Sequence, residues 1–599
     1  MPDSIHDSTV QATRSGARQR GQTKTVQVGS QNVTIPVPFP SPEDWRDQWI
    51  YFLMVDRFNN PTTGPSHTPF DKDVGEFQGG KLEGVRQKLD YLQDLGVGAI
   101  WLSPVLKNSQ WDEHTHHGYG IQDFLEVEPR FGTEVDLQSL VDEAHARGIY
   151  VILDIVLNHA GNLFNYEGAA DSRDWKGSGP EYRIFWRDSH GDAQGTWTDV
   201  GQVPEPRQRD GLVWPKELQR NDFWRRRGDV GGSPDETRGD FGSLKELVTE
   251  YLRDGSKFPV RDLLIQAHQY LIAKFDIDGF RIDTLKYVEE DFARVFGSAC
   301  REFALSIGKR NFFTYGEVWE DNADAEEKIV RFVGRNTERD QQPIGVDAAL
   351  DFPLFRKLGD VVKGRTAPVE LDGLFTRRRE VHRKILSSHG EAGRFFVTFL
   401  DNHDLNQRFY FQPAGNPHEF DAQLVLAVTC LLCLQGVPCI YYGTEQGLHG
   451  IGDRREFVRE ALWGMQPPFD QTHAFYEAIQ KIDGVRRAEP ALRYGRQYFR
   501  ELSGDGNDWG PSTFPQGVIA FCRILDDREV VIAANTHTSR QETLYVQVDS
   551  DLTPVGSPVR ALYFNPTLPT APTSVVSMGG RAAVQVALPP MGVQILARD

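Results

Sequence analysis

The feature that most constrains the fold is a repeated alternation of short apolar runs and amphipathic segments. The first two runs are WIYFLM at 49–54 and GAIWLS at 98–103, and the segment at 82–92 between them carries leucine and valine at helical spacing. A strand, a helix and a second strand in this order form a βαβ unit, whose two strands are parallel. The start of the pattern therefore predicts a parallel sheet.

The same alternation continues over most of the chain. A helix at about 136–147 ends at Gly148 and is followed by a third strand, IYVILDIV, at 149–156. Five more strands are expected, at 278–283, 312–318, 345–352, 395–401 and 437–443. Eight parallel strands with this many crossovers favour a closed (β/α)8 barrel of the TIM type over 45–487. An open doubly wound sheet is the alternative, but no glycine-rich phosphate loop follows the first strand.

Three further regions surround this α/β barrel. More than a hundred residues separate the third strand from the fourth, which predicts an inserted domain B at about 160–250. Its five tryptophans can pack a core or stack on a ligand, and core packing is favoured. Residues 1–44 are rich in polar residues and proline and are expected to be a flexible N-terminal extension. Short alternating strands over 488–599 predict a C-terminal antiparallel β-sandwich.

Charge and hydropathy exclude several classes of partner. The chain has 85 acidic and 66 basic residues, a net charge of −19, which disfavours nucleic acid and anionic lipid. No run approaches the roughly 18 apolar residues of a membrane span, so no membrane partner is expected. The polar N-terminus lacks an apolar signal-peptide core, so a cytoplasmic location is expected, or secretion if a signal was removed. The five cysteines predict no disulfide framework.

Polar side chains end four of the predicted strands. In a (β/α)8 barrel the carboxyl ends of the strands form the active site, so these residues are the candidates for chemistry. They are Asp154, Asn158 and His159 in DIVLNH, Arg281 and Asp283 in GFRID, Glu317 in GEVW, and Asp401, Asn402, His403 and Asp404 in FLDNHD. A single carboxylate in such a place is more often a helix cap or a solvated loop residue. Polar residues at the ends of four strands, in the order in which a barrel places those strands, favour a catalytic role instead.

Two of these endings predict a pair of catalytic carboxyl groups. Arg281 and Asp283 are two residues apart on a strand and share a face, so the guanidinium keeps the carboxylate ionised, as a nucleophile requires. Glu317 ends the next strand, where a less polar setting lets it hold a proton and donate it to a leaving oxygen. Retaining glycosidases use such a pair at about 5–5.5 Å.

The four endings resemble those of the α-amylase superfamily of retaining glycoside hydrolases. The flanking segments IYFLMVDRF, LDYLQDLGVGAIWLSPV, HGYGIQDF and GVPCIYYGTEQG resemble it too, and order and spacing match over about 45–599. The resemblance implies hydrolysis of α-1,4-glucosidic bonds in starch-like glucans or maltooligosaccharides through a covalent glucosyl-enzyme. A transglycosylase or isomerase of the same superfamily is the alternative. A non-catalytic carbohydrate-binding scaffold is a more remote alternative, because the three carboxylates that the family uses for catalysis, Asp283, Glu317 and Asp404, are all present.

The resemblance also implies a role for each matched residue. Asp283 would be the nucleophile, Glu317 the acid/base, and Asp404 a third carboxylate that holds sugar hydroxyls. Four residues would position the sugar and the nucleophile: Tyr119, His159, Arg281 and His403. Asp154 would be structural. The partner would be an α-glucan or maltooligosaccharide, and the oligomeric state stays open.

Two departures from the family pattern affect specificity and metal binding. Lys286 and Tyr287, which would also bind substrate, stand where many members have Lys-His, and this alters the leaving-group side of the site. The segment SLKEL at 243–247 stands where the family has roughly SLPDL. Asn158 and Glu246 would then be the counterparts of calcium ligands, since both offer the oxygen donors that calcium prefers. No organic cofactor is expected.

Overall fold

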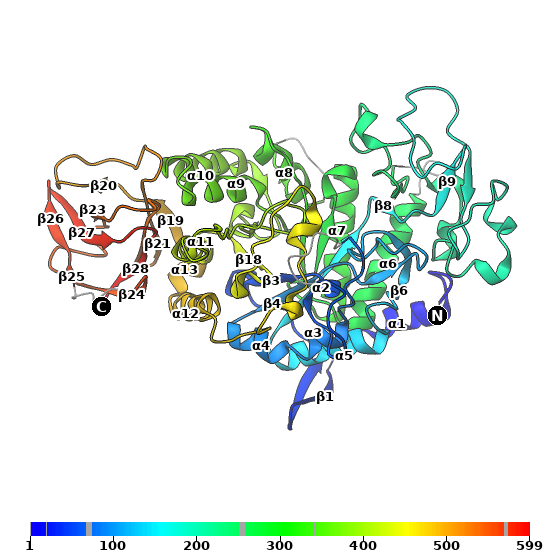
Figure 1. The fold of residues 1–599 in the computed structure, drawn as a ribbon, viewed down its shortest axis with the longest axis horizontal. Coiled ribbons are helices and arrows are strands. Elements are labelled where there is room, and N and C mark those ends of the chain that lie inside the picture. The colour runs from blue at the N-terminus through cyan, green and yellow to red at the C-terminus, as the bar shows by residue number, and fades with distance from the viewer. Residues whose placement is uncertain (1, 19–20, 68–74, 251–257, 339–342, 568–572) are drawn as a thin grey trace.

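A closed barrel of parallel strands lies at the centre of the structure, a computed structural model that describes residues 2–18, 21–67, 75–250, 258–338, 343–567 and 573–599 (Figure 1). The strand order is β15, β13, β12, β7, β4, β3, β18, β17. A parallel bridge between Leu350, next to β15, and Val397 of β17 joins the two ends of the sheet. The predicted (β/α)8 barrel is therefore confirmed.

Each barrel strand lies within one of the eight predicted runs. The strands are β3 (Ile50–Leu53), β4 (Ala99–Leu102), β7 (Tyr150–Val156), β12 (Gly279–Asp283), β13 (Phe313–Gly316), β15 (Ala348–Ala349), β17 (Val397–Thr398) and β18 (Val437–Tyr441). All of their residues but Tyr150 are buried. Strands covered on both faces are mostly apolar, which is why they appear in the sequence as apolar runs with few polar residues, such as Asp154 and Arg281.

Helices surround the barrel, most of them between its strands and the last two, α12 and α13, after β18. They are α2 (Val55–Phe58), α3 (Leu82–Arg86), α4 (Leu89–Leu95), α5 (Glu134–Ala146), α6 (Pro259–Phe275), α7 (Glu290–Ile307), α8 (Ala325–Val333), α9 (Phe352–Val362), α10 (Val369–His382), α11 (Asp421–Cys433), α12 (Ala474–Ala488) and α13 (Pro490–Tyr494). In α5, Thr133 and Asp136 form a capping box, and Leu137, Leu140, Val141 and Ala144 are buried. No helix in the described part of the chain has the length and apolarity to cross a bilayer.

The insertion after β7 contains short strands and 3-10 turns. Its strands are β8 (His159–Ala160), β9 (Phe164–Tyr166), β10 (Ile184–Trp186) and β11 (Lys245–Glu246), and the region lies at one end of the molecule (Figure 1). Trp186, Trp214 and Trp224 are buried. Trp175 and Trp197 are half-buried. Packing within the insertion therefore accounts for the three buried tryptophans.

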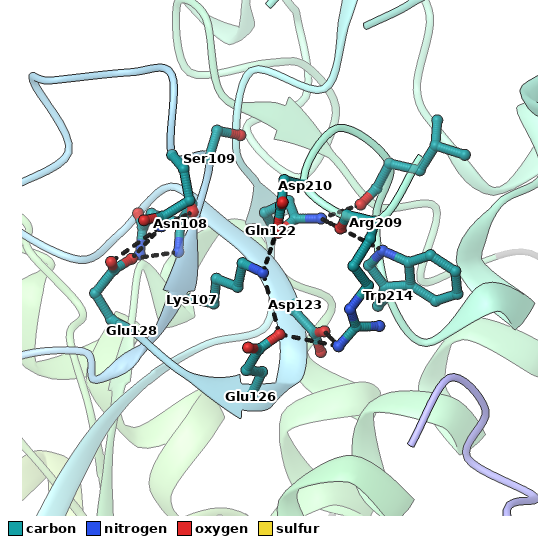
Figure 2. Close-up of polar contacts among 12 residues, drawn as sticks. Lys107, Asn108, Ser109, Gln122, Asp123, Glu126, Glu128, Arg209, Asp210 and Trp214 are labelled. Atoms are coloured by element: carbon teal, nitrogen blue, oxygen red, sulfur yellow. Dashed lines mark hydrogen bonds and ion pairs between the residues drawn. The ribbon is translucent and has the colours of Figure 1, made fainter. Parts of the chain in front are cut away.

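A network of charged side chains attaches the insertion to the hairpin of β5 (Leu106–Asn108) and β6 (Ile121–Val127) (Figure 2). Arg209 Nη2 lies 2.7 Å from an Asp123 oxygen and 2.9 Å from a Glu126 oxygen. Lys107 Nζ bridges Glu126 at 3.1 Å and Asp210 at 2.7 Å. Burial raises the pKa of Asp123 to about 6, although Arg209 lowers it. The two cations offset three carboxylates and tie the insertion to the barrel.

The described part of the N-terminal segment, predicted to be a flexible extension over 1–44, contains regular secondary structure. Its described residues form α1 (Ser8–Gly16) and a hairpin of β1 (Gln22–Val28) and β2 (Gln31–Val37), which projects from the barrel in Figure 1. Ile5 and Val10 are fully buried. The Asp3 carbonyl accepts a hydrogen bond from Lys216 of the insertion at 2.9 Å, and the Phe39 amide donates one to Asp276 at 2.7 Å. A few apolar and polar contacts order the segment despite its polar composition.

The C-terminal region is made of two antiparallel sheets. One contains β19 (Arg496–Phe499), β21 (Val518–Leu525), β22 (Arg528–Asn535), β28 (Val593–Arg598), β24 (Pro558–Asn565) and β25 (Thr573–Ser574), and the other β20 (Leu502–Ser503), β23 (Glu542–Gln547), β27 (Arg581–Leu588) and β26 (Val576–Met578). They enclose a separate apolar core. The predicted C-terminal β-sandwich is confirmed, whereas the boundaries at 44/45 and 487/488 stay predictions.

Candidate active site

A cavity of about 640 Å³ opens at the carboxyl ends of the barrel strands. It brings together seven of the residues singled out from the sequence: Tyr119, His159, Asp283, Lys286, Tyr287, Glu317 and Asp404. Arg281 and His403, which are buried, contact this group from below the cavity wall. None of the five tryptophans of the insertion is among the described residues that line the cavity.

Arg281 joins the carboxylates of three neighbouring strands. β12 lies between β7 and β13, and its register places Arg281 beside Asp154 and Tyr315. Arg281 Nη1 lies 2.9 Å from Asp154 Oδ1 and 2.7 Å from Asp283 Oδ1, and Nη2 lies 3.1 Å from Glu317 Oε2. Because one planar guanidinium contacts both Asp283 and Glu317, the two carboxyl groups lie on the same side of the cavity.

Glu317 is also fixed by the backbone next to Asp283. The Thr284 amide donates a hydrogen bond of 3.0 Å to Glu317 Oε2, and the Glu317 amide donates one of 2.9 Å to the Ile282 carbonyl. Thr284 has a φ of 47°, in the left-handed region that a β-branched residue rarely adopts. This turn directs its amide toward Glu317.

Burial raises the pKa of both Asp283 and Glu317, to about 7 in each case, although Arg281 lowers them. Neighbouring carboxylates raise both pKa values further, because like charges at short range oppose ionisation: Asp154 and Asp404 act on Asp283, and Asp283 and Asp404 act on Glu317. The pair therefore titrates as a unit in two steps. Arg281 lies closer to Asp283 than to Glu317, which favours an ionised Asp283 beside a protonated Glu317.

Asp404 has the opposite electrostatic setting. Burial raises its pKa, but His403, Arg459 and Arg455 together outweigh burial and hold the pKa well below its usual range. Arg455 Nη1 lies 3.2 Å and Arg459 Nη2 3.4 Å from Asp404 Oδ1. Asp404 therefore stays ionised over the whole range in which proteins are stable.

Tyr119 and the two histidines form a neutral, hydrogen-bonding wall. The Tyr119 hydroxyl lies 2.9 Å from Asp154 Oδ2 and 2.7 Å from His403 Nε2. Burial lowers the pKa of His159 to about 4 and that of His403 to about 3, so both rings are neutral near pH 7. His159 Nε2 is buried and has no hydrogen-bond partner among the described residues. This nitrogen is available to a ligand in the cavity.

Three aromatic side chains, Phe241, Tyr287 and Trp319, also line the cavity. Tyr287 packs edge-on against Phe241 with ring centroids 4.6 Å apart, and Trp319 stacks on Phe352 at 4.8 Å. Lys286 Nζ donates a hydrogen bond of 2.9 Å to the Trp319 carbonyl. Lys286 thus positions the segment after Glu317, and the exposed faces of Phe241, Tyr287 and Trp319 offer stacking surfaces.

The residues predicted to bind calcium make other contacts. The Asn158 carbonyl accepts a hydrogen bond of 2.9 Å from the Leu247 amide, and Glu246 is buried on β11. Arg225 Nε lies 3.4 Å from Glu246 Oε1, and the Gly239 amide donates to the other oxygen. Arg225 also pairs with Glu250. A guanidinium beside the charged oxygen donor does not fit a calcium cage, which needs several free oxygens.

A different acidic group in the insertion has metal-ligand spacing. One ligand atom each from Asp188, His190 and Asp192 lies within 4.8 Å of the others. The Asp188 carboxylate, however, accepts hydrogen bonds from the amides of His190 and Asp192 and pairs with Arg207 at 2.8 Å. These contacts account for the fold of the loop.

Several residues of the cavity were not singled out from the sequence. They are His117, Phe241, Leu244, Thr284, Trp319, Glu320, Asp321, Arg455, Glu456 and Arg459. His117 lies in the HGYGIQDF segment and Trp319 directly after Glu317, so their motifs pointed to them. Arg455 and Arg459 belong to the charged run RREFVRE after β18, which has no periodicity that marks it as part of a site.

Comparison with known proteins places the chain in a family. The family model "Alpha amylase, catalytic domain" matches residues 52–488. The chain is 28% identical over 576 residues to an α-amylase of Streptomyces lividans, covering 89% of this chain and 57% of that protein. It is 27% identical over 476 residues to a cyclomaltodextrin glucanotransferase of Geobacillus stearothermophilus, covering 76% and 56%. The chain thus spans little more than half the length of these two curated relatives.

Solved structures with the same fold cover nearly the whole chain. A Geobacillus thermoleovorans α-amylase complexed with acarbose has a TM-score of 0.64 and 25% identity, and the match covers 93% of this chain and 99% of that one. An Anoxybacillus α-amylase has a TM-score of 0.64 and 26% identity with the same coverage. The fold of this chain therefore resembles that of solved α-amylases over most of its length.

Proposed function

Because this chain belongs to the α-amylase family, we propose that it is a retaining glycoside hydrolase that cleaves α-1,4-glucosidic bonds in starch-like glucans or maltooligosaccharides. The observation that carries the proposal is the single guanidinium of Arg281, which contacts Asp283 at 2.7 Å and Glu317 at 3.1 Å in the cavity. Two carboxyl groups held together in this way supply one nucleophile and one acid. The family membership supports the substrate class.

In the proposed reaction, Asp283 Oδ attacks the anomeric carbon while Glu317 donates its proton to the glycosidic oxygen. The bond between that carbon and the leaving oxygen breaks, and a covalent glucosyl-enzyme forms on Asp283. Glu317, now ionised, takes a proton from water, and the resulting hydroxide displaces Asp283. The raised pKa of Glu317 suits both steps, since the group must hold and then regain a proton near neutral pH.

The remaining side chains of the cavity position the sugar in this proposal. Asp404, ionised at all working pH values, accepts hydrogen bonds from sugar hydroxyls. His159 donates or accepts through Nε2, the atom that has no other partner. Tyr119 lines the cavity and His403 lies behind it, and their mutual hydrogen bond holds the Tyr119 ring in place. Asp154 acts only by holding Arg281 and Tyr119.

A transglycosylase is the second candidate, and the aromatic wall favours it. Phe241, Tyr287 and Trp319 line the same cavity as Glu317, the group that would protonate the leaving oxygen. A sugar that stacks there competes with water for the glucosyl-enzyme. The glucanotransferase among the relatives is consistent with this alternative.

Calcium is not part of the proposed mechanism. Arg225 contacts Glu246 and Glu250, so its guanidinium supplies the positive charge that a cation would bring to Glu246. We propose that the insertion keeps its fold without calcium at Asn158 and Glu246.

The stereochemistry of the first product tests the mechanism. Two displacements at one carbon give net retention, so an α-linked substrate yields an α-configured product. Proton NMR of a maltoheptaose digest, read before mutarotation, is expected to show the α-anomer ahead of the β-anomer. A β-anomer formed first contradicts the role of Asp283. Longer products after addition of maltose would favour the transglycosylase.

A further inference from the structure

A second cavity lies on the C-terminal sandwich, apart from the catalytic one. It measures about 400 Å³ and lies between the segment at 502–518 and the start of β23. None of its lining residues belongs to the barrel or lines the catalytic cavity. Its size falls in the range of small-molecule sites, about 300–1,000 Å³.

Two aromatic side chains form the apolar part of this cavity. Phe514 is 54% exposed, one of the few large apolar residues of the described chain with so much exposed surface. Trp509 is half-buried, and its indole nitrogen donates a hydrogen bond of 3.1 Å to the Gly506 carbonyl. The Arg581 guanidinium lies 5.4 Å from the Trp509 ring centroid but does not line the cavity. Trp509 is therefore held rigidly, with part of its ring surface facing the cavity.

Polar groups around the aromatic rings have unused hydrogen-bonding capacity. Ser512 lines the cavity and is 8% exposed, and its hydroxyl oxygen is buried without a hydrogen-bond partner among the described residues. Leaving a buried hydroxyl unpaired costs free energy, so such a group points to a ligand. Asp508, which is exposed, and Glu542 add carboxylate acceptors to the rim.

We propose that this cavity is a second binding site for α-glucan chains, which holds polymeric substrate on the C-terminal sandwich. The inference rests on the proposed function for its ligand class. The apolar faces of glucose rings stack on aromatic side chains, and sugar hydroxyls donate to carboxylates and pair with a free serine hydroxyl. Acidic residues on the rim disfavour an anionic ligand, and a purely apolar ligand leaves Ser512 unpaired.

The backbone of the cavity suits a fixed binding surface. The Val369 amide at the start of α10 donates a hydrogen bond of 3.0 Å to the Ser512 carbonyl, and the Thr536 amide donates one of 3.2 Å to Gly517. The segment that carries Ser512 and Phe514 is thus tied to the barrel and to the end of β22. A rigid surface loses little conformational entropy when it binds a chain.

Binding to insoluble starch granules tests the inference. The measurement uses the full chain with Glu317→Gln, so that the granules are not digested, and compares it with the same chain that also carries Trp509→Ala and Phe514→Ala. The dissociation constant for granules is expected to rise about tenfold or more when both rings are lost. Tyr498→Ala is the matched control, because Tyr498 is 43% exposed on the same sandwich but does not line this cavity; its affinity should not change.

Two further measurements make the result specific. In the active background, Trp509→Ala with Phe514→Ala should leave kcat/KM for maltotriose unchanged, because the short substrate needs only the catalytic cavity. Ser512→Ala removes only the hydroxyl and should weaken granule binding several-fold. If the Trp509→Ala, Phe514→Ala double variant does not fold, granule binding by Ser512→Ala alone tests the inference.

The inference is overturned if the double variant binds granules as tightly as its parent, if the parent does not bind them, or if Tyr498→Ala weakens binding equally. It fails too if Trp509→Ala with Phe514→Ala lowers kcat/KM for maltotriose. The proposed function has a separate test: a wild-type chain that binds granules through this cavity but cleaves no maltooligosaccharide would remove the function and keep the binding site.

Discussion

At the scale of single residues, the charge balance around Arg281 decides which groups hold protons. One buried guanidinium contacts three carboxyl groups, on Asp154, Asp283 and Glu317. Burial of three negative charges beside one positive charge is unfavourable, and a bound proton relieves it. Burial accordingly raises the pKa of Asp154 to about 6 as well. The site thus keeps a proton near neutral pH, which is what an acid catalyst needs.

Substitution of the two carboxylates is expected to abolish turnover and preserve the fold. Asp283→Asn and Glu317→Gln keep the shape of each side chain but remove nucleophile or acid, so each should lower kcat for maltoheptaose at least a hundredfold. The losses should not add in the double variant, since both groups serve one covalent mechanism. The control is an unchanged circular dichroism spectrum. More than about a hundredth of wild-type activity in Asp283→Asn would rule out its role.

The pH dependence of kcat/KM is expected to be bell-shaped. Activity needs one proton on the pair, with Asp283 ionised and Glu317 protonated. The rate rises with pH as Asp283 loses its proton, and it falls as Glu317 loses its own, with an alkaline limb near the raised pKa of about 7. Asp404 stays ionised and therefore adds no further limb to the pH profile of kcat/KM. With an aryl maltoside, whose leaving group needs little protonation, kcat/KM should fall less at alkaline pH than with maltoheptaose. An equal fall for the aryl maltoside and maltoheptaose would contradict the acid role of Glu317.

At the scale of elements, Arg225 links two parts of the insertion. It precedes β11 by twenty residues, and its backbone amide and side chain both contact Glu246. Removal of one partner of a buried ion pair leaves the other charge uncompensated. Arg225 therefore stabilises the place where the family motif suggested calcium.

Chelation is expected to leave the stability of the wild-type chain unchanged. An ion that binds only the folded state raises the melting temperature, so its removal by excess EDTA would lower it. Because Arg225 already pairs with Glu246, we expect the same melting curve with and without EDTA. Arg225→Met should destabilise the fold by about 3–5 kcal/mol, because it leaves Glu246 buried and unpaired. Arg220→Met, a change at a largely exposed arginine, is the control. A lower melting temperature in EDTA would show that a cation is bound.

At the scale of the whole molecule, the six-stranded sheet of the sandwich has two buried faces. Val518, Ala520 and Cys522 of β21 belong to the core of the sandwich. The alternating residues Ile519 and Phe521 belong to the apolar cluster of the barrel instead. Arg523 adds a hydrogen bond of 2.7 Å to the Cys433 carbonyl at the end of α11. The sandwich therefore completes the core of the barrel.

This shared core predicts that barrel and sandwich unfold together. Phe521→Ala should destabilise both by about 3–5 kcal/mol, the usual loss for a large buried aromatic ring. Calorimetry should show one transition that moves to lower temperature in the variant, and loss of activity on heating should follow it. Tyr498→Ala, at an exposed ring on the same sheet, is the control. Two separate transitions, with the barrel transition unmoved, would contradict the shared core.

The barrel and the carboxylates of the site were predictable because local patterns encode them. A strand buried on both faces is mostly apolar, so a polar residue at its end or directly after it is conspicuous, as Asp283 and Glu317 show. Arg455, Arg459 and Arg225 lie in irregular segments, where no periodicity marks the residues that reach a distant carboxylate. The contacts of the N-terminal segment were not predicted for a related reason, because they involve Ile5 and Val10, two apolar residues in a polar composition.

The two ends of the chain lie at opposite ends of the molecule, with the N-terminal segment against the insertion and the C-terminus on the far side of the sandwich (Figure 1). An affinity tag or a fused protein attached after Asp599 therefore projects away from the barrel. One attached before Asp3 lies against the insertion, because the Asp3 carbonyl accepts a hydrogen bond from the Lys216 amide. For immobilisation on a solid support, the carboxyl end is therefore the attachment point that leaves the insertion free.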